Sequence, residues 1–187
     1  MNSIISSEEN LIAILKEVEL GNLSAFGVVV KNYQHYAFSV AFRCLSNEED
    51  AKDVVQESFI KIWKNIGSFN GKVKFTTWMH KIVINLCYDK LRMRKRAVKR
   101  NEELNEEIME SCENLEKLYV NKEQAEIIKY ISDRLPKKQR FVFVLRDLEG
   151  LTTEEVSQVL DISIQSVKTN LSLARKEIRT RLIKWRT

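Results

Sequence analysis

The sequence contains very few residues that interrupt helices. Proline occurs once and glycine five times among 187 residues, and the alternation of apolar and polar residues that marks a half-buried strand is almost absent. These absences argue against a protein built on sheets and turns. They favour an all-α fold, and the length allows one or two small domains.

Residues suited to metal or thiol chemistry are also scarce. Cys44, Cys87 and Cys112 lie far apart, and no CxxC or CxxH pair occurs, so the spacing predicts no zinc site. Cys44 and Cys87 fall on apolar helical stretches, which is typical of small core residues. Neither His35 nor His80 has neighbours that would complete a catalytic triad. We therefore expect no metal, no cofactor and no catalytic residues.

The sequence also lacks long hydrophobic runs. Its N-terminus has no basic segment followed by an apolar stretch, and no segment approaches the roughly 20 apolar residues of a membrane-spanning helix. These absences predict a soluble, intracellular protein without membrane insertion.

Charge is distributed unevenly along the chain. The formal net charge is +5 and the sequence pI is ≈ 9.0. Residues 91–100 contain six lysines and arginines and no acidic residue, whereas residues 101–126 contain nine glutamates and only two lysines. This change divides the chain into a helical domain at 1–100, an acidic linker at 101–120 and a second domain at 121–187.

Hydrophobic periodicity predicts helices at residues 8–20, 22–44, 48–66 and 75–96, with a glycine-containing loop at 67–71. The last of these helices has two distinct faces. One face is apolar and should pack in the core: Met79, Ile82, Val83 and Leu86. The other mixes aromatic, amide and cationic residues that can stack on unpaired bases and hold phosphates: Trp78, Lys81, Asn85, Tyr88 and Arg92. The alternative for Trp78 is a large core residue at the helix edge.

The segment 150–173 predicts two short amphipathic helices joined by a tight connector at 161–163. The apolar stripe of the second helix consists of Ile164, Val167, Leu171 and Ala174. Between these positions lie residues that donate to base edges and phosphates: Gln165, Ser166, Lys168, Thr169, Ser172 and Arg175. The pattern indicates a helix-turn-helix whose second helix enters a major groove. The alternative is a helical hairpin with a solvated polar face.

These segments together resemble one family, the extracytoplasmic-function (ECF) sigma factors. Residues 50–63, 69–71 and 75–92 are similar to their region 2, and residues 135–141 with the helix-turn-helix are similar to their region 4. The resemblance covers about residues 20–185, in the same order and with a linker between the regions. It implies an all-α fold of two small helical domains, sigma region 2 and a region 4 helix-turn-helix, joined by an acidic linker.

By this resemblance the protein is a bacterial, cytoplasmic transcription initiation factor and not an enzyme. It would bind core RNA polymerase and direct it to promoters. Region 2 would recognise and melt the minus-ten element, and region 4 would bind the minus-thirty-five element as duplex. The expected partners are core RNA polymerase, promoter DNA and a cognate anti-sigma factor.

The resemblance also assigns residues to these tasks. Contacts with the clamp helices of the largest polymerase subunit are implied for Asp50, Asp53, Gln56 and Glu57. Contacts with minus-ten DNA are implied for Lys72, Lys74, Phe75, Trp78, Lys81, Asn85 and Arg92, with Asn85 reading a base beside the loop that captures a flipped base. Contacts with minus-thirty-five DNA are implied for Gln165, Lys168, Thr169, Ser172 and Arg175. The chain departs from the family at Asn170 and Leu173, where arginine is common.

Other interpretations of these features stay open. The acidic start of the 48–66 helix also suits the helix dipole without any partner. The acidic linker either mimics a polyanion inside the polymerase channels or serves as a flexible tether. The helix-turn-helix could belong to an operator-binding regulator, although no long dimerisation helix is evident. An enzyme acting on nucleic acid would use Asp50, Asp53 and Glu57 as metal ligands, but the apolar residues around them fit helix packing.

Overall fold

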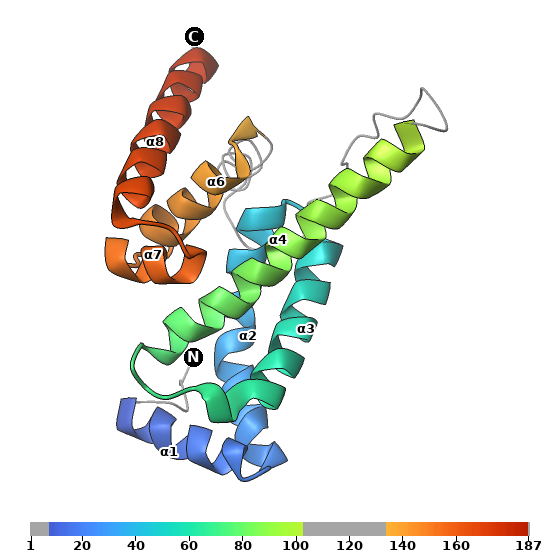
Figure 1. The fold of residues 1–187 in the computed structure, drawn as a ribbon, viewed down its shortest axis with the longest axis vertical. Coiled ribbons are helices and arrows are strands. Elements are labelled where there is room, and N and C mark those ends of the chain that lie inside the picture. Colours follow the sequence, from blue (N-terminus) through green and yellow to red (C-terminus); the bar gives the residue numbers. More distant parts are fainter. Residues whose placement is uncertain (1–7, 103–133, 187) are drawn as a thin grey trace.

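The computed structural model describes residues 8–102, the N-terminal unit, and residues 134–186, the C-terminal unit. The described residues form helices joined by short turns, with no strand among them, which confirms the all-α prediction (Figure 1). The N-terminal unit contains α1 (Glu8–Glu19), α2 (Leu23–Leu45), α3 (Glu48–Asn65), the 3-10 helix η1 (Ile66–Ser68) and α4 (Phe75–Glu102). The C-terminal unit contains α6 (Lys137–Phe143), the π-helical turn η2 (Val144–Leu148), α7 (Thr153–Leu160) and α8 (Ile164–Arg186).

The predicted helix boundaries of the N-terminal unit hold to within one residue, except at the end of α4. This helix continues to Glu102 instead of ending near residue 96, and therefore enters the segment predicted as the linker. Residues 103–133, which include most of that segment and the predicted first helix of the second domain, lie outside the described residues.

Asparagine side chains begin the two helices that carry most of the N-terminal core. Asn22 Oδ1 accepts hydrogen bonds from the backbone N–H groups of Ser24 and Ala25 at 3.0 and 3.1 Å, and Asn47 Oδ1 accepts one from Asp50 N at 2.8 Å. Each cap satisfies amide donors that have no partner within the helix. Ser46 takes a left-handed conformation with φ 52° and ends α2, so the predicted break at 46–47 is confirmed.

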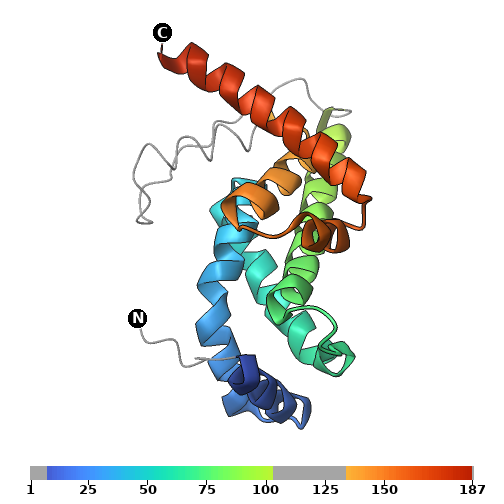
Figure 2. The ribbon, with the colours of Figure 1, turned by 90° about the vertical axis from the view of Figure 1, so that its left-hand side faces the viewer.

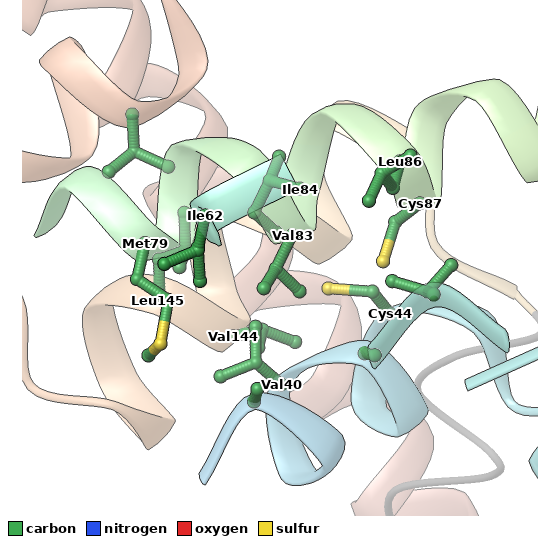
Figure 3. Packing of buried hydrophobic residues seen from close by; sticks show 14 of the residues in the cluster. Val40, Cys44, Ile62, Met79, Val83, Ile84, Leu86, Cys87, Val144 and Leu145 are labelled. Atoms are coloured by element: carbon green, nitrogen blue, oxygen red, sulfur yellow. The ribbon is translucent and has the colours of Figure 1, made fainter. Parts of the chain in front are cut away.

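The core of the N-terminal unit lies between α2, α3 and α4, and α1 packs across α2 (Figure 1). Of the four residues predicted as the core face of α4, Met79, Val83 and Leu86 are buried, whereas Ile82 is half-buried. Cys44 and Cys87 are buried free thiols that lie side by side (Figure 3). Their prediction as small core residues is therefore confirmed.

In the C-terminal unit, hydrogen bonds fix the start of α7 and the short connection between α7 and α8. Thr152 and Glu155 form a capping box at the start of α7: Thr152 Oγ1 accepts from Glu155 N at 3.1 Å, and Glu155 Oε2 accepts from Thr152 N at 2.8 Å. Asp161 ends α7 in a left-handed conformation with φ 52°. Ser157 Oγ donates to Ile162 O at 2.6 Å across the connector. These contacts fix the turn that precedes α8, as the helix-turn-helix prediction requires.

The two units share one continuous hydrophobic core. Figures 1 and 2 place α6 and α7 beside α4 and the C-terminal half of α2. Figure 3 shows Val144 and Leu145 of the C-terminal unit among core residues that include Val40 and Met79. The Tyr88 ring packs edge-on against Phe141 with centroids 4.4 Å apart. Tyr88 therefore packs between the units and does not belong to the polar face on which the sequence pattern placed it.

Candidate nucleic-acid and protein interfaces

An aromatic cluster lies where the 67–74 loop meets the start of α4. The rings of Phe69, Phe75 and Trp78 have centroid separations of 5.5 to 5.9 Å. Phe75 is only 3% exposed and also contacts Tyr33, so it forms the inner wall of the cluster and offers no surface to DNA. Tyr33 of α2 and Phe69 of the loop pack against it, so its predicted contact with DNA stays a prediction that would require these rings to move. Trp78 is half-buried, so part of its ring is reachable.

The loop before α4 presents two of the predicted phosphate contacts. Asn70 Oδ1 accepts a hydrogen bond from Lys72 N at 3.1 Å, and Gly71 has φ +69°, a conformation that favours glycine. The tight turn leaves the side chains of Lys72 and Lys74 exposed. Two cations therefore border the aromatic cluster.

An exposed strip on α4 continues from Trp78. Lys81, Asn85 and Arg92 follow it at spacings that keep one helical face, and all three are exposed. Arg92 lies 3.8 Å from Asp89 in an exposed ion pair, which contributes little to stability. The structure thus brings together six of the seven residues predicted to contact minus-ten DNA, with Phe75 behind them.

The four residues predicted to contact core polymerase fall into two groups along α3. Asp50 is half-buried and lies 2.5 Å from Arg94 and 3.6 Å from Lys90. Asp53 accepts a hydrogen bond from Lys90 Nζ at 2.8 Å, and this bond is the main reason why the pKa of Lys90 is raised. These two carboxylates tie α3 to α4.

Gln56 and Glu57, the other two predicted contacts on α3, are exposed. They are free to meet a partner without breaking a contact between helices, since Glu57 pairs only with Lys61 of the same helix among the described residues, at 3.3 Å.

An apolar groove between α2 and α3 lies beside Gln56. Its volume is ≈ 690 Å³, and its lining is mainly aromatic and aliphatic: Leu23, Phe26, Val30, Phe38, Val55, Phe59, Ile60 and Trp63, with Gln34, His35, Lys52 and Gln56 also contributing. The sequence pattern predicted the two helices but not this groove. The available signal was a second apolar residue directly after Phe59, Ile60, which is 46% exposed.

The second helix of the helix-turn-helix, α8, presents the predicted polar face. Val167 and Ala174 are buried, whereas Gln165, Lys168, Thr169 and Ser172 are exposed. Ile164, predicted to belong to the apolar stripe, is instead 42% exposed, because the first residue of the helix has no neighbour covering it.

Arg175 and Asn170, two polar residues in the N-terminal half of α8, form hydrogen bonds within the protein. Arg175 makes a two-point contact with Asp147 of η2, from Nε at 2.8 Å and from a terminal nitrogen at 2.6 Å, and this contact raises its pKa. Asn170 donates back to Ser166 O at 2.8 Å. This pairing leaves part of the guanidinium exposed but partly neutralises the charge that Arg175 can offer to a phosphate.

Glu149 and His80 are buried ionisable side chains close to the contact between the units. The Glu149 carboxylate, 4% exposed, pairs with Arg43, and burial raises the pKa of Glu149 although Arg43 and a hydrogen bond from Tyr36 act in the opposite direction. Burial also lowers the pKa of His80, on α4, to about 4. The His80 ring packs edge-on against Tyr36 with centroids 5.1 Å apart.

Among residues 8–102 and 134–186, no group of three His, Cys, Asp or Glu side chains is arranged to hold a metal ion. No helix in these ranges is long and apolar enough to span a membrane.

Comparison with known proteins identifies two regions of the chain. Residues 29–97 match the family model described as Sigma-70 region 2, and residues 125–178 match the one described as Sigma-70, region 4. The chain is 30% identical to the ECF RNA polymerase sigma factor SigW of Bacillus subtilis, over 90% of this chain and 94% of that protein. It is also 30% identical to the ECF RNA polymerase sigma-E factor of Salmonella typhimurium, over 88% and 90% of the two chains.

Two solved structures have the same fold. The sigma factor RpoE in complex with the anti-sigma factor NepR from Bartonella quintana superposes with a TM-score of 0.72 at 22% identity, over 84% of this chain and 96% of that chain. CnrH in complex with the cytosolic domain of CnrY superposes with a TM-score of 0.67 at 23% identity, over 92% and 96%.

Proposed function

Because the chain belongs to the ECF family of RNA polymerase sigma factors and directs promoter-specific transcription initiation, we propose how its described surfaces divide this work. The N-terminal unit reads minus-ten DNA through α4 and docks on core polymerase through α3. The C-terminal unit reads the minus-thirty-five duplex through α8. The observation that carries the proposal is the exposed strip Trp78–Lys81–Asn85, which joins an aromatic cluster to polar and cationic groups.

The minus-ten surface suits single-stranded DNA better than duplex. A base that leaves the stack loses a few kcal/mol, and an aromatic face recovers about 1–3 kcal/mol per base. Trp78 supplies that face, with Phe75 supporting it from behind. Asn85 presents both a donor and an acceptor and can therefore distinguish base edges. The phosphates are held by Lys72, Lys74, Lys81 and Arg92. These contacts fix the position of the DNA strand on the protein but do not read its sequence.

The proposed polymerase surface consists of Asp53, Gln56 and Glu57 together with the α2–α3 groove beside them. An apolar groove with a polar rim is the usual receptor for the apolar face of a partner helix, and the resemblance to the family points to the clamp helices of the largest subunit. Asp50 has a different task in this proposal. Its ion pairs with Lys90 and Arg94 hold α3 against α4, so it positions both surfaces.

The proposed minus-thirty-five surface is the N-terminal half of α8. Gln165 and Thr169 are placed to reach base edges, and Lys168 and Ser172 to hold phosphates. Arg175 joins them through the part of its guanidinium that Asp147 does not hold.

We also propose that this sigma factor acts in the bacterial cytoplasm and is bound by an anti-sigma factor. The RpoE structure with which it shares its fold is a complex with the anti-sigma factor NepR.

In vitro transcription with core polymerase tests these assignments. A library of genomic promoter fragments is transcribed with the parent chain and with the Gln56→Ala, Glu57→Ala double variant. We expect the double variant to bind core polymerase about tenfold more weakly, through loss of about 1.4 kcal/mol. Its C-terminal half should still bind duplex DNA. Equal affinity of the two proteins for core polymerase would remove this face of α3 from the docking surface.

A further inference from the structure

The exposed side of α8 carries positive charge well beyond the half proposed to read the minus-thirty-five element. The exposed side chains described between residues 164 and 183 are all uncharged or cationic. Glu177 is the one acidic residue in the sequence of this helix, and it is half-buried and accepts a hydrogen bond from Arg181 Nε at 2.6 Å. Over these residues, α8 therefore presents no exposed carboxylate that would repel a phosphate.

Four cations follow one another along one face of α8. Lys168, Arg175 and Arg179 are separated by seven and then four residues, which keeps them on the same side of the helix. Together with Lys176 they line a shallow depression of ≈ 520 Å³. Asp147 pairs with Arg175, whereas the other three cations form no ion pair with any described residue. Three exposed positive charges are therefore available to an anion.

The length of α8 carries two of these cations past the groove that its first half is proposed to enter. The helix has 23 residues and is about 34 Å long, whereas the major groove of B-DNA is about 12 Å wide and winds around the duplex. A recognition helix contacts bases with its N-terminal residues. Lys176 and Arg179 lie about 12 and 16 Å further along the axis than Lys168, which brings them over the groove edge, at the level of the phosphates. Figures 1 and 2 show that this part of α8 extends past α6, away from α7.

The N-terminal half of α8 has little free positive charge of its own. Asp147 partly neutralises Arg175. Asn170 donates back to a carbonyl of its own helix at 2.8 Å, and Leu173 is apolar and 46% exposed. Among the described residues of this half, Lys168 is the one cation without an ion pair. Because phosphate neutralisation supplies much of the affinity for duplex DNA, further cations on the same face would strengthen binding.

We propose that Lys176 and Arg179, the basic extension of α8, bind backbone phosphates of the duplex that flanks the minus-thirty-five element. The inference rests on the proposed assignment of the N-terminal half of α8 to that element. Since every step of the duplex carries the same phosphate, these contacts add affinity and fix the angle at which α8 crosses the DNA, and they add no base preference. The stretch of duplex that α8 contacts is therefore longer than the stretch of bases that it reads.

The experiment uses the full chain assembled with core polymerase on a promoter fragment that the parent transcribes. Ethylation interference maps the phosphates that binding requires, and filter binding at several salt concentrations measures the affinity and its salt slope. The test variant is Lys176→Gln, Arg179→Gln. The control variant Lys16→Gln, Lys138→Gln removes the same charge from one exposed lysine in each unit.

We expect ethylation to reduce binding of the parent at phosphates within the minus-thirty-five element and at phosphates beside it. The test variant should lose the dependence on the flanking phosphates, bind about tenfold more weakly at about 0.1 M salt, and show a salt slope smaller by about two units. The control variant should keep the parent's interference pattern and bind within about twofold of it. Base changes within the element should have the same relative effect on all three proteins.

Three results would overturn the inference. The first is an unchanged dependence of the test variant on the flanking phosphates. The second is a loss of affinity no larger than that of the control variant. The third is weaker assembly of the test variant with core polymerase together with an unchanged interference pattern, which would assign Lys176 and Arg179 to a protein contact. Circular dichroism should show the same helix content in all three proteins, because the four substituted side chains are exposed.

Lys168→Ala and Thr169→Ala separate this inference from the proposed function. If these two variants weaken binding or change the base preference, and the test variant keeps its dependence on the flanking phosphates, the minus-thirty-five surface stands and the basic extension is overturned. If neither variant changes affinity or base preference, the proposed minus-thirty-five surface of α8 fails, and the inference fails with it.

Discussion

The two helices proposed to meet DNA, α4 and α8, expose their polar residues in different ways. In its N-terminal half, α8 has one buried stripe, and all five of its predicted DNA contacts are exposed. By contrast, α4 is buried along two stripes. One faces α2 and α3, and the other carries Thr77, His80 and Ile84 and leads to Tyr88, which contacts the C-terminal unit. A DNA surface on a central helix is therefore a narrow strip whose position depends on two sets of neighbours.

The largest expected difference between these helices is the loss of unfolding free energy when an apolar side chain is replaced by alanine. Ile84→Ala on α4 should lower the free energy of unfolding by about 2–5 kcal/mol, because the side chain is fully buried and its loss leaves a cavity. Leu173→Ala on α8 should change it by less than about 0.5 kcal/mol, because that side chain is 46% exposed. Urea denaturation followed by circular dichroism measures both. Similar small losses at the two positions would mean that the second stripe of α4 is not a packed interface.

The next effect concerns pH and the buried His80. Its pKa falls from 6.5 to about 4 in the folded protein, mainly through burial, so the unfolded chain binds the proton first. Stability contributed by neutral His80 is present above pH 6.5 and is lost as the pH falls toward 4, by about 2 kcal/mol between pH 7 and pH 5. The raised pKa of Glu149 has the opposite effect on the free energy of unfolding. Over the lower part of this pH range the folded protein binds a proton at Glu149 before the unfolded chain does, which favours the folded state as the pH falls.

The comparison of parent and His80→Leu isolates the histidine. Unfolding free energies of both proteins are measured in urea from pH 7 to pH 5. The parent should lose about 2 kcal/mol more than the variant over this interval. Parallel pH profiles would show that His80 titrates normally in the folded chain and that the second stripe of α4 admits water.

A smaller effect separates two neighbours on the exposed strip of α4. Asn85→Ala should reduce open-complex formation about tenfold, equivalent to about 1.4 kcal/mol, and should relax the preference at one minus-ten position. Lys81→Ala should weaken all promoters to a similar degree, because phosphates carry no sequence information. Permanganate footprinting across minus-ten variants distinguishes them, with binding to core polymerase as the control. A uniform loss of melting with Asn85→Ala would make Asn85 a structural residue.

The smallest effect concerns two cations on α8. Lys168→Ala should reduce the slope of log affinity against log salt by about one unit for duplex binding. Arg175→Ala should reduce it by less, because Asp147 already neutralises part of the charge of Arg175. Asp147→Asn tests this reason directly and should strengthen duplex binding. Equal slopes for Lys168→Ala and the parent would remove Lys168 from the phosphate contacts.

The sequence predicted the local features of the molecule well because each depends on residues close together in the chain. The helices follow from apolar spacing, and the break between α2 and α3 follows from Ser46 and Asn47. The exposed face of α8 follows from the alternation of Val167 and Ala174 with polar residues. One amphipathic stripe and one polar face are sufficient to describe such a helix, so the residues predicted for DNA contact are found where the pattern put them.

Features that depend on contacts between distant segments could not be predicted in this way. Phe75 has the residue type of a base-stacking side chain, but Tyr33 and Phe69 cover it. Asp50 has the residue type of a partner contact, but Arg94 and Lys90 already hold it. In the same way Tyr88 packs on Phe141 from the other unit. The residue type of each of these side chains suits both a contact with a partner and a contact inside the protein. The neighbours that decide between the two roles are mostly distant in the sequence.

The sequence by itself therefore determined the family, the helical class and the residue types available for DNA and polymerase contact, since periodicity and motif spacing are properties of the chain alone. Tertiary structure alone decided which of those side chains are accessible. It also decided that Glu149 and Glu155 lie against Arg43 and Lys74, that α4 carries a second buried stripe, and that a groove opens between α2 and α3. The physical reason is that burial and ion pairing depend on which helices pack together, and the packing of two units across a long connection leaves no local pattern in either one.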